Sequence, residues 1–162
     1  MLKARQVLDD CRFALDRLTH AVGRQEYRVM FLATIALCRA VGHVLRNVDR
    51  DQSSEAGHKI DVQFKQIDDS KKDPQSIYWH FIKKERDILI KEYQCNYDDG
   101  SLDLWTCDDW YSIVDMNSCA MKHGPFQGVD SIKLLRQAIE WWDTQLSEIE
   151  RSLPGAASKG TP

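Results

Sequence analysis

The stretch V-M-F-L-A-T-I-A-L-C-R-A-V-G-H-V-L, residues 29–45, decides the fold because apolar side chains occupy most sides of the helix that it predicts. A surface helix is apolar along one stripe, whereas a helix in the centre of a bundle is apolar on most sides. We therefore expect a central helix over about residues 25–48, and we expect it to be the most buried element. Its apolar run is shorter than the roughly 20 residues of a membrane span, so no membrane partner is expected.

Three longer segments on either side of this central helix also have helical spacing. Their apolar residues recur three or four positions apart over residues 4–22, 74–94 and 132–149. Gly23 is expected to end the first of these helices, and Pro74 is well tolerated in the first turn of the second. The last helix begins after Asp130 or Ser131, which are both suited to cap it.

Two polar segments complete the chain before and after the helix at 74–94. Residues 49–73 repeat apolar side chains at helical spacing, which predicts a short extra helix behind a cap at Ser53 or Ser54. Residues 95–129 form an acidic, partly irregular insertion, in which L-D-L-W and Y-S-I-V alternate enough to allow a hairpin. A structured loop over one end of the bundle fits this insertion as well.

These segments predict an all-α protein, an up-and-down four-helix bundle with a short extra helix and an irregular acidic insertion before the last helix. The chain of 162 residues has the length and composition of one globular domain, which we place at residues 1–153. The tail, residues 154–162, has no core-forming side chains and is expected to be disordered. The N-terminus does not have the pattern of a secretory signal, so we expect a cytoplasmic protein.

The cysteines and the motif search predict neither a metal site nor a cofactor. The five cysteines are an odd number, without a C-x-x-C pair or a histidine at zinc-ligand spacing. Cys11 and Cys38 lie on apolar helical faces, where a thiol behaves as a small hydrophobic group. Glycine-rich phosphate loops and metal-binding carboxylate pairs are also missing from the sequence.

Charged residues interrupt the apolar stripe of the helix at 74–94. Glu85 and Arg86 lie within the apolar arc of this helix, and buried charges need partners. Arg39 and His43 are four residues apart on the central helix and therefore share one face. If the two helices pack antiparallel, these faces meet. A buried pairing of Arg39 with Glu85, acting as a structural lock, is our first expectation.

The alternative is that Arg39, His43, Glu85 and Arg86 line an open cleft or a dimer seam. In that arrangement His43, which titrates near neutral pH, is a general acid or base. The arginines stabilise negative charge on a phosphate.

The segment Arg86-Asp87-Ile88-Leu89-Ile90-Lys91, together with the four main helices, resembles the HEPN domains of bacteria over residues 1–94 and 130–152. Many HEPN domains are ribonuclease toxins or nucleotidyltransferase partners that dimerise. Their catalytic motif is an arginine, often followed by Asn, Asp or His, with a histidine downstream. Arg86 and Asp87 match this motif, but Lys91 stands in place of the histidine. A lysine amine is protonated at pH 7 and is a poor general base.

We therefore expect a non-enzymatic HEPN-like module that acts through self-association or a partner protein in a bacterial regulatory or defence system, such as a toxin–antitoxin pair. The alternative is a HEPN-type ribonuclease or nucleotide-acting toxin that uses Arg86 with His43. A third hypothesis is RNA or nucleotide binding by the mildly basic N-terminal helices.

Two adjacent tryptophans in the last helix point in different directions. Trp142 falls on the apolar stripe and is expected to pack in the core. Trp141 lies about 100° away around the helix, where we expect it to meet the 95–129 segment or another subunit.

Overall fold

The computed structural model describes residues 1–98 and 119–153, and it confirms the all-α class. The described residues contain two isolated β-bridges and no β-strand. The α-helices are α1 (Lys3–Thr19), α2 (Arg24–Asn47), α3 (Ser54–Asp69), α4 (Lys84–Glu92) and α5 (Ser131–Arg151). The shorter turns are η1 (Asp49–Gln52), η2 (Ser70–Lys72) and η3 (Tyr78–Lys83), of which η3 is π-helical.

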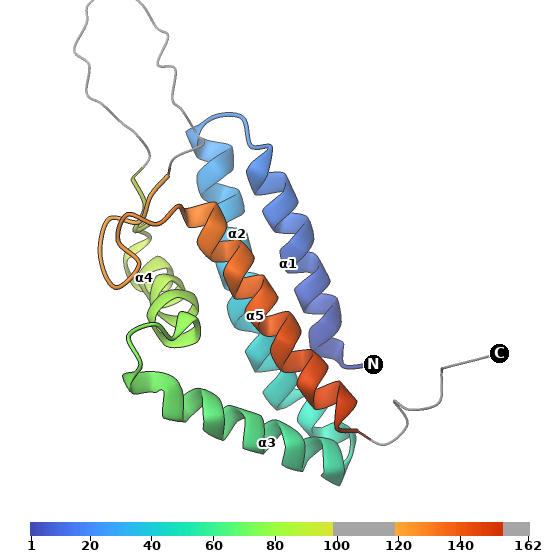
Figure 1. The fold of residues 1–162 in the computed structure, drawn as a ribbon. Coiled ribbons are helices and arrows are strands. Elements are labelled where there is room, and N and C mark those ends of the chain that lie inside the picture. Colours follow the sequence, from blue (N-terminus) through green and yellow to red (C-terminus); the bar gives the residue numbers. More distant parts are fainter. Residues whose placement is uncertain (99–118, 154–162) are drawn as a thin grey trace, which may run out of the picture.

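Three helices, α1, α2 and α5, lie side by side and form the body of the fold (Figure 1). The short extra helix expected within 49–73 is α3, which lies across one end of this body (Figure 1). Both η3 and α4 pack against α2, and η3 also packs against α5. The single helix expected over residues 74–94 is therefore a π-helical turn followed by a short α-helix.

The predicted helix ends agree with the structure at α2, α3 and α5, and they differ at α1 and before η3. Ser53 caps α3 and Asp130 caps α5, because each side chain accepts a backbone N–H hydrogen bond, at 3.1 and 2.7 Å. The first helix already ends at Thr19, and Gly23 instead precedes α2 with a φ of +88°, a conformation that favours glycine. Pro74 lies in a turn ahead of η3 rather than in its first turn.

Burial of α2 is concentrated on one side of the helix. The helix buries eight of its 24 residues, and α5 buries eight of its 21, so the prediction that α2 is the most buried element is wrong. Val29 is 44% exposed and His43 also faces solvent. The reason is geometric, because α1, α5 and the η3–α4 segment surround only part of α2.

Among the described residues, one helical stretch, residues 24–52, is long and apolar enough by composition to cross a membrane. Core helices commonly pass the same test. Here the side chains of Phe31, Ile35 and Cys38 are fully buried in the core.

The described ends of the acidic insertion belong to the core. Tyr97 forms an antiparallel β-bridge with Met121, and both side chains are buried, as is Cys119. The hairpin predicted for the insertion falls on residues 99–118, which lie outside the described residues, as does the tail from residue 154. The insertion therefore leaves and re-enters the fold at one buried place.

Asp49 caps the start of α1 from a distant part of the chain. Its buried carboxylate accepts the backbone N–H of Lys3 at 2.6 Å and that of Ala4 at 2.8 Å. The Nε2 of Gln52 donates a third hydrogen bond at 2.7 Å. The N-cap residue of α1, Leu2, has no side chain that could accept these N–H groups, so Asp49 takes over this role.

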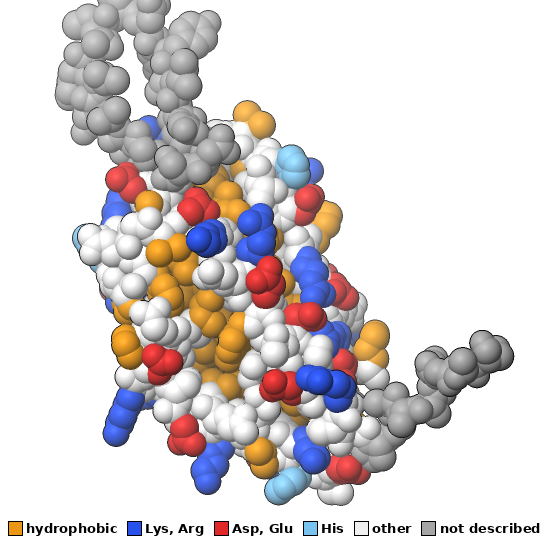
Figure 2. Space-filling view, in the orientation of Figure 1, with side chains coloured by type: hydrophobic (Ala, Val, Ile, Leu, Met, Phe, Trp, Pro, Cys, Tyr) orange, Lys and Arg blue, Asp and Glu red, His pale blue; other side chains and the backbone are white. Residues whose placement is uncertain are grey.

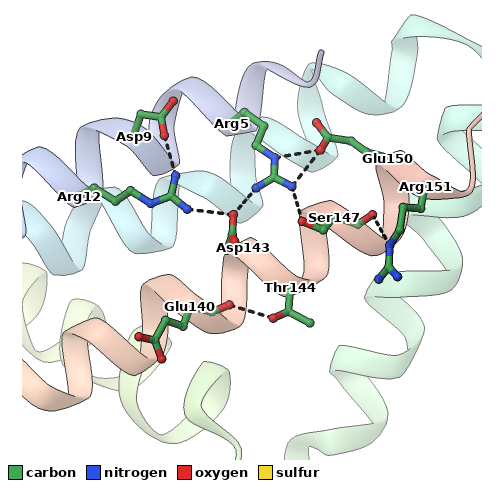
Figure 3. A network of polar contacts seen from close by, with 9 residues as sticks. All are labelled: Arg5, Asp9, Arg12, Glu140, Asp143, Thr144, Ser147, Glu150 and Arg151. Carbon is green, nitrogen blue, oxygen red and sulfur yellow. Dashed lines mark hydrogen bonds and ion pairs between the residues drawn. The ribbon is translucent and has the colours of Figure 1, made fainter. Parts of the chain in front are cut away.

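A polar network joins α1 to α5 (Figure 3). The guanidinium of Arg5 contacts Asp143, donates to Glu150 at 3.0 Å and donates to Ser147 at 2.7 Å. Arg12 reaches the same Asp143 at 2.9 Å. The Arg5 side chain is only 16% exposed, whereas that of Arg12 is 44% exposed, so Arg5 contributes most to this joint.

Candidate functional site

The structure divides the four predicted site residues into two groups. Arg39 and His43 lie on α2, while Glu85 and Arg86 lie on α4, which packs against α2. The positive charges of Arg39 and Arg86 both act on His43, so these three side chains share one region. Glu85 instead faces the place where the ends of the insertion meet. We refer to Arg39, His43 and Arg86 as the basic cluster.

Arg39 is held by Tyr78 of η3. Its Nη1 donates a hydrogen bond to the Tyr78 hydroxyl, and its guanidinium carbon lies 5.3 Å from the centroid of the Tyr78 ring. The predicted pairing of Arg39 with Glu85 is therefore wrong. The π-helical η3 explains the difference, because its hydrogen bonds span one residue more than those of an α-helix. Side chains after such a turn are displaced from the positions that a regular helical pattern assigns.

Aromatic rings fix the position of Tyr78. Trp141 and Trp142 of α5 lie 5.7 and 5.9 Å from Tyr78 between ring centroids, and Trp79 lies 5.3 Å away. Trp142 is fully buried, as predicted, and the half-buried Trp141 lies against η3. Figure 2 shows hydrophobic side chains gathered on the surface between α5 and the η3–α4 segment. This packing leaves the Tyr78 hydroxyl where the guanidinium of Arg39 can reach it.

Glu85 joins α4 to the ends of the insertion. Its side chain is 3% exposed, and Oε1 accepts a hydrogen bond from Nδ2 of Asn96 at 3.1 Å. The same Asn96 amide donates to the carbonyl of His123 at 3.0 Å. Burial raises the pKa of Glu85, and the hydrogen bonds from Asn96 offset this only in part. Glu85 is therefore a buried structural joint, with Asn96 as its partner in place of Arg39.

His43 is exposed on α2 beside two arginines. Partial burial lowers its pKa, and the charges of Arg39 and Arg86 lower it further. The imidazole is therefore neutral at pH 7 and able to accept a proton. The buried Nε of Arg39 has no hydrogen-bond partner among the described residues.

Arg86 is shared between the basic cluster and Asp87. Its Nη1 donates to Asp87 at 2.9 Å, and the Nζ of Lys83 donates to the other oxygen of the same carboxylate at 2.8 Å. Burial alone would raise the pKa of Asp87, but the hydrogen bonds from Lys83 and Arg86 outweigh it and lower the pKa. Asp87 therefore stays ionised and neutralises part of the local positive charge.

The basic cluster can attract an anion and accept a proton. Glu85, the carboxylate predicted to line the same cleft, is instead buried against Asn96. Lys91, which stands in place of the histidine of the HEPN motif, is exposed and lines a pocket together with Lys71, Lys83 and Lys84. General acid–base catalysis needs a second group that is positioned for the opposite proton transfer. The geometry therefore supports anion contact better than bond cleavage.

No protein-family model matches this chain, and neither the curated proteins nor the solved structures contain a match. The proposals below therefore rest on the geometry of the described residues and on the resemblance of the Arg86 segment to HEPN domains.

The sequence pattern missed Tyr78 and Asn96 as partners of the predicted site residues. Tyr78 has the spacing of the buried side of its helix, and spacing alone does not show which group its hydroxyl meets. Such a buried phenol does indicate that a polar partner must come from a neighbouring helix. Asn96 follows the helix in a segment without periodicity, so no pattern indicated its contact with Glu85.

Proposed function

We propose that this protein is a non-enzymatic, HEPN-like helical module that acts by self-association in a bacterial regulatory or defence system. An exposed apolar row beside the basic cluster is the observation that carries the proposal. In this proposal η3 and α4 take the place of the fourth helix of an up-and-down bundle, and the module works in the cytoplasm. A partner protein that binds the same surface is the alternative occupant.

The apolar row lies along α4 and its C-cap. Arg86 and Ile90 are four residues apart on one side of α4, and Tyr93 is the C-cap residue, in the left-handed conformation with a φ of +52°. Ile90 is 64% exposed and Tyr93 is 68% exposed. Single exposed apolar residues are common, but two large ones in register with a charged residue form a surface suited to binding.

A matching exposed side of α2 lies beside this row. Val29, Ala36 and His43 are all exposed, and they are seven residues apart and so share one side of α2. The charge of Arg86 acts on His43, and the charge of Arg28 acts on Cys95, so α2 and α4 run antiparallel. We name this combined surface the α2–α4 face.

The α4 row is complementary to a second copy of itself. Arg86 stands at one end of the row, Tyr93 at the other and Ile90 near the middle. A two-fold axis near Ile90 places Arg86 of each chain against the Tyr93 ring of the other. An arginine over a tyrosine ring is a favourable contact, and the two isoleucines would meet at the centre.

Light scattering after size-exclusion chromatography tests this proposal at tens of micromolar protein. We expect a dimer for the unmodified chain and a monomer for Ile90→Asp, because the charge would be buried at the centre of the interface. Val62→Asp is the matched control, since Val62 is a 44% exposed aliphatic residue on α3. A strict monomer, or equal dissociation by both variants, would contradict self-association through this face.

A ribonuclease or nucleotide-acting toxin is the second candidate function, favoured by the neutral imidazole of His43 between Arg39 and Arg86. In a dimer, two copies of the basic cluster would lie near the same seam and could contact one RNA strand. Purified protein would then cleave RNA, and folded Arg86→Ala would lose this activity. RNA that stays intact over hours, or full activity of that variant, excludes this candidate.

A further inference from the structure

A basic pocket lies beside the η3–α4 segment and borders the basic cluster at Asp87, which lines the pocket and pairs with Arg86. Its volume is about 640 Å³, and residues of η2, η3 and α4 line it. Lys84, Ile88 and Lys91 lie about half a turn around the helix from Arg86, so the pocket is separate from the α2–α4 face. Pockets that bind small molecules have volumes of about 300 to 1,000 Å³.

Positive charge dominates the walls of this pocket. Four lysines line it, Lys71, Lys83, Lys84 and Lys91, against two carboxylates, Asp87 and Glu92. Asp87 is already paired with Lys83 and with Arg86, which lies beside the pocket. The ammonium groups of Lys71, Lys84 and Lys91 therefore outnumber the carboxylate of Glu92. This excess of positive charge favours an anion with more than one negative charge.

Trp79 organises two of these lysines. The Nζ atoms of Lys71 and Lys83 lie 5.2 and 5.7 Å from the centroid of the Trp79 ring. The indole Nε1 donates to the carbonyl of Ile67 at 2.7 Å, which fixes the ring against the end of α3. Cation–π contacts of this kind hold flexible lysine ammonium groups near one another before a ligand arrives.

His80, which lines the pocket, has a buried polar atom. The Nε2 of His80 is buried and makes no hydrogen bond among the described residues. Buried polar atoms in this state are usually satisfied by ordered water or by a ligand. Trp79 and Ile88 add apolar surface beside the lysines.

We propose that this pocket binds a small organic phosphate. Lys84 and Lys91 contact the phosphoryl oxygens as point charges, with Lys71 and Lys83 close by. The apolar part of the ligand lies against Trp79 and Ile88. The pocket thus gives the protein a ligand site that is separate from self-association.

Isothermal titration of the full chain with adenosine triphosphate, pyrophosphate and inorganic phosphate tests the proposal. We expect saturable binding of the nucleotide, weaker binding of pyrophosphate and the weakest binding of inorganic phosphate. The variant Lys84→Gln/Lys91→Gln should raise the Kd by about tenfold for each lysine removed. Lys65→Gln is the matched control, because Lys65 is exposed on α3 and outside the pocket.

Three results would overturn the proposal. They are no heat of binding with nucleotide at millimolar concentration, an unchanged Kd in the double variant, and an equal loss in Lys65→Gln. Inorganic phosphate binding as tightly as the nucleotide would refute the apolar part of the site. Far-UV circular dichroism of the double variant checks its fold. Light scattering should show that the double variant associates as the unmodified chain does, which separates ligand binding from self-association.

Discussion

Replacing Asp49 with alanine tests how strongly one distant side chain stabilises the first helix. The carboxylate accepts the N–H groups of Lys3 and Ala4 at 2.6 and 2.8 Å, and it is fully buried. Alanine removes both acceptors and leaves these donors in a place that water reaches poorly. The sequence around α1 contains no other capping side chain, because its N-cap residue is Leu2.

The magnitude follows from three contributions that partly overlap. Loss of an N-cap costs about 0.5 to 2 kcal/mol, and the negative charge at a helix N-terminus contributes about 0.3 to 1 kcal/mol. A buried donor left without a partner costs about 1 to 3 kcal/mol. We expect Asp49→Ala to lower the free energy of unfolding by about 3 kcal/mol, and Asp49→Asn by about half of that, because one oxygen remains.

Urea unfolding followed by far-UV circular dichroism measures this change through the midpoint of the transition. Asp51→Ala is the control, since Asp51 lies in the same turn, is 75% exposed and only approaches Arg50 at 3.8 Å. Its effect should stay within about 0.5 kcal/mol. An Asp49→Ala variant as stable as the Asp51→Ala control would refute the assignment of Asp49 as the cap of α1.

Three further predictions concern charged groups. Burial raises the pKa of Glu85 above its ordinary value of 4.5, so ionisation of Glu85 lowers the stability of the protein as pH rises through the raised pKa. The stability gained by Glu85→Gln, measured by urea unfolding, should therefore be larger at pH 7 than at pH 4.5. A gain that does not change with pH would contradict this. Arg5→Ala should cost about 2 kcal/mol because it leaves Glu150 without its arginine and Asp143 with Arg12 alone, whereas Arg12→Ala, at a more exposed site, should cost under about 1 kcal/mol. Equal thermal shifts in the two variants would argue against the network. Arg86→Gln removes a positive charge near His43, so the His43 pKa measured by NMR titration should rise, and an unchanged pKa would place Arg86 out of its reach.

The helical class and several helix ends could be predicted from local pattern. The caps of α3 and α5 could be narrowed to Ser53 or Ser54 and to Asp130 or Ser131, because a cap acts within three residues of its own position, and the structure has Ser53 and Asp130. The cap at Asp49 could not be predicted, since its partners lie 45 and 46 residues away. Gly23 was assigned to the wrong helix for a related reason: its positive φ suits a helix end and equally suits the turn between two helices.

The candidate site was predicted less well, and the reason is the π-helical turn. A pattern read at 3.6 residues per turn gives Glu85 the same face as the residues that meet α2. The longer hydrogen-bond span of the π-helical η3 changes that register, so the guanidinium of Arg39 binds the Tyr78 hydroxyl and Glu85 faces Asn96. His43 still lies near Arg39 and Arg86, because this proximity depends on the packing of α2 against α4.

The β-bridge between Tyr97 and Met121 affects which positions of this sequence tolerate substitution during evolution. Both anchors are buried and are joined by backbone hydrogen bonds, such as that from the N–H of Lys122 to the carbonyl of Asn96 at 3.0 Å. Loop-closure entropy changes by only about 0.6 kcal/mol for each doubling of loop length. A cost of this size leaves the burial of the two anchors as the main constraint, so substitutions at Tyr97 or Met121 are expected to disturb the connection of α4 and α5 to the core.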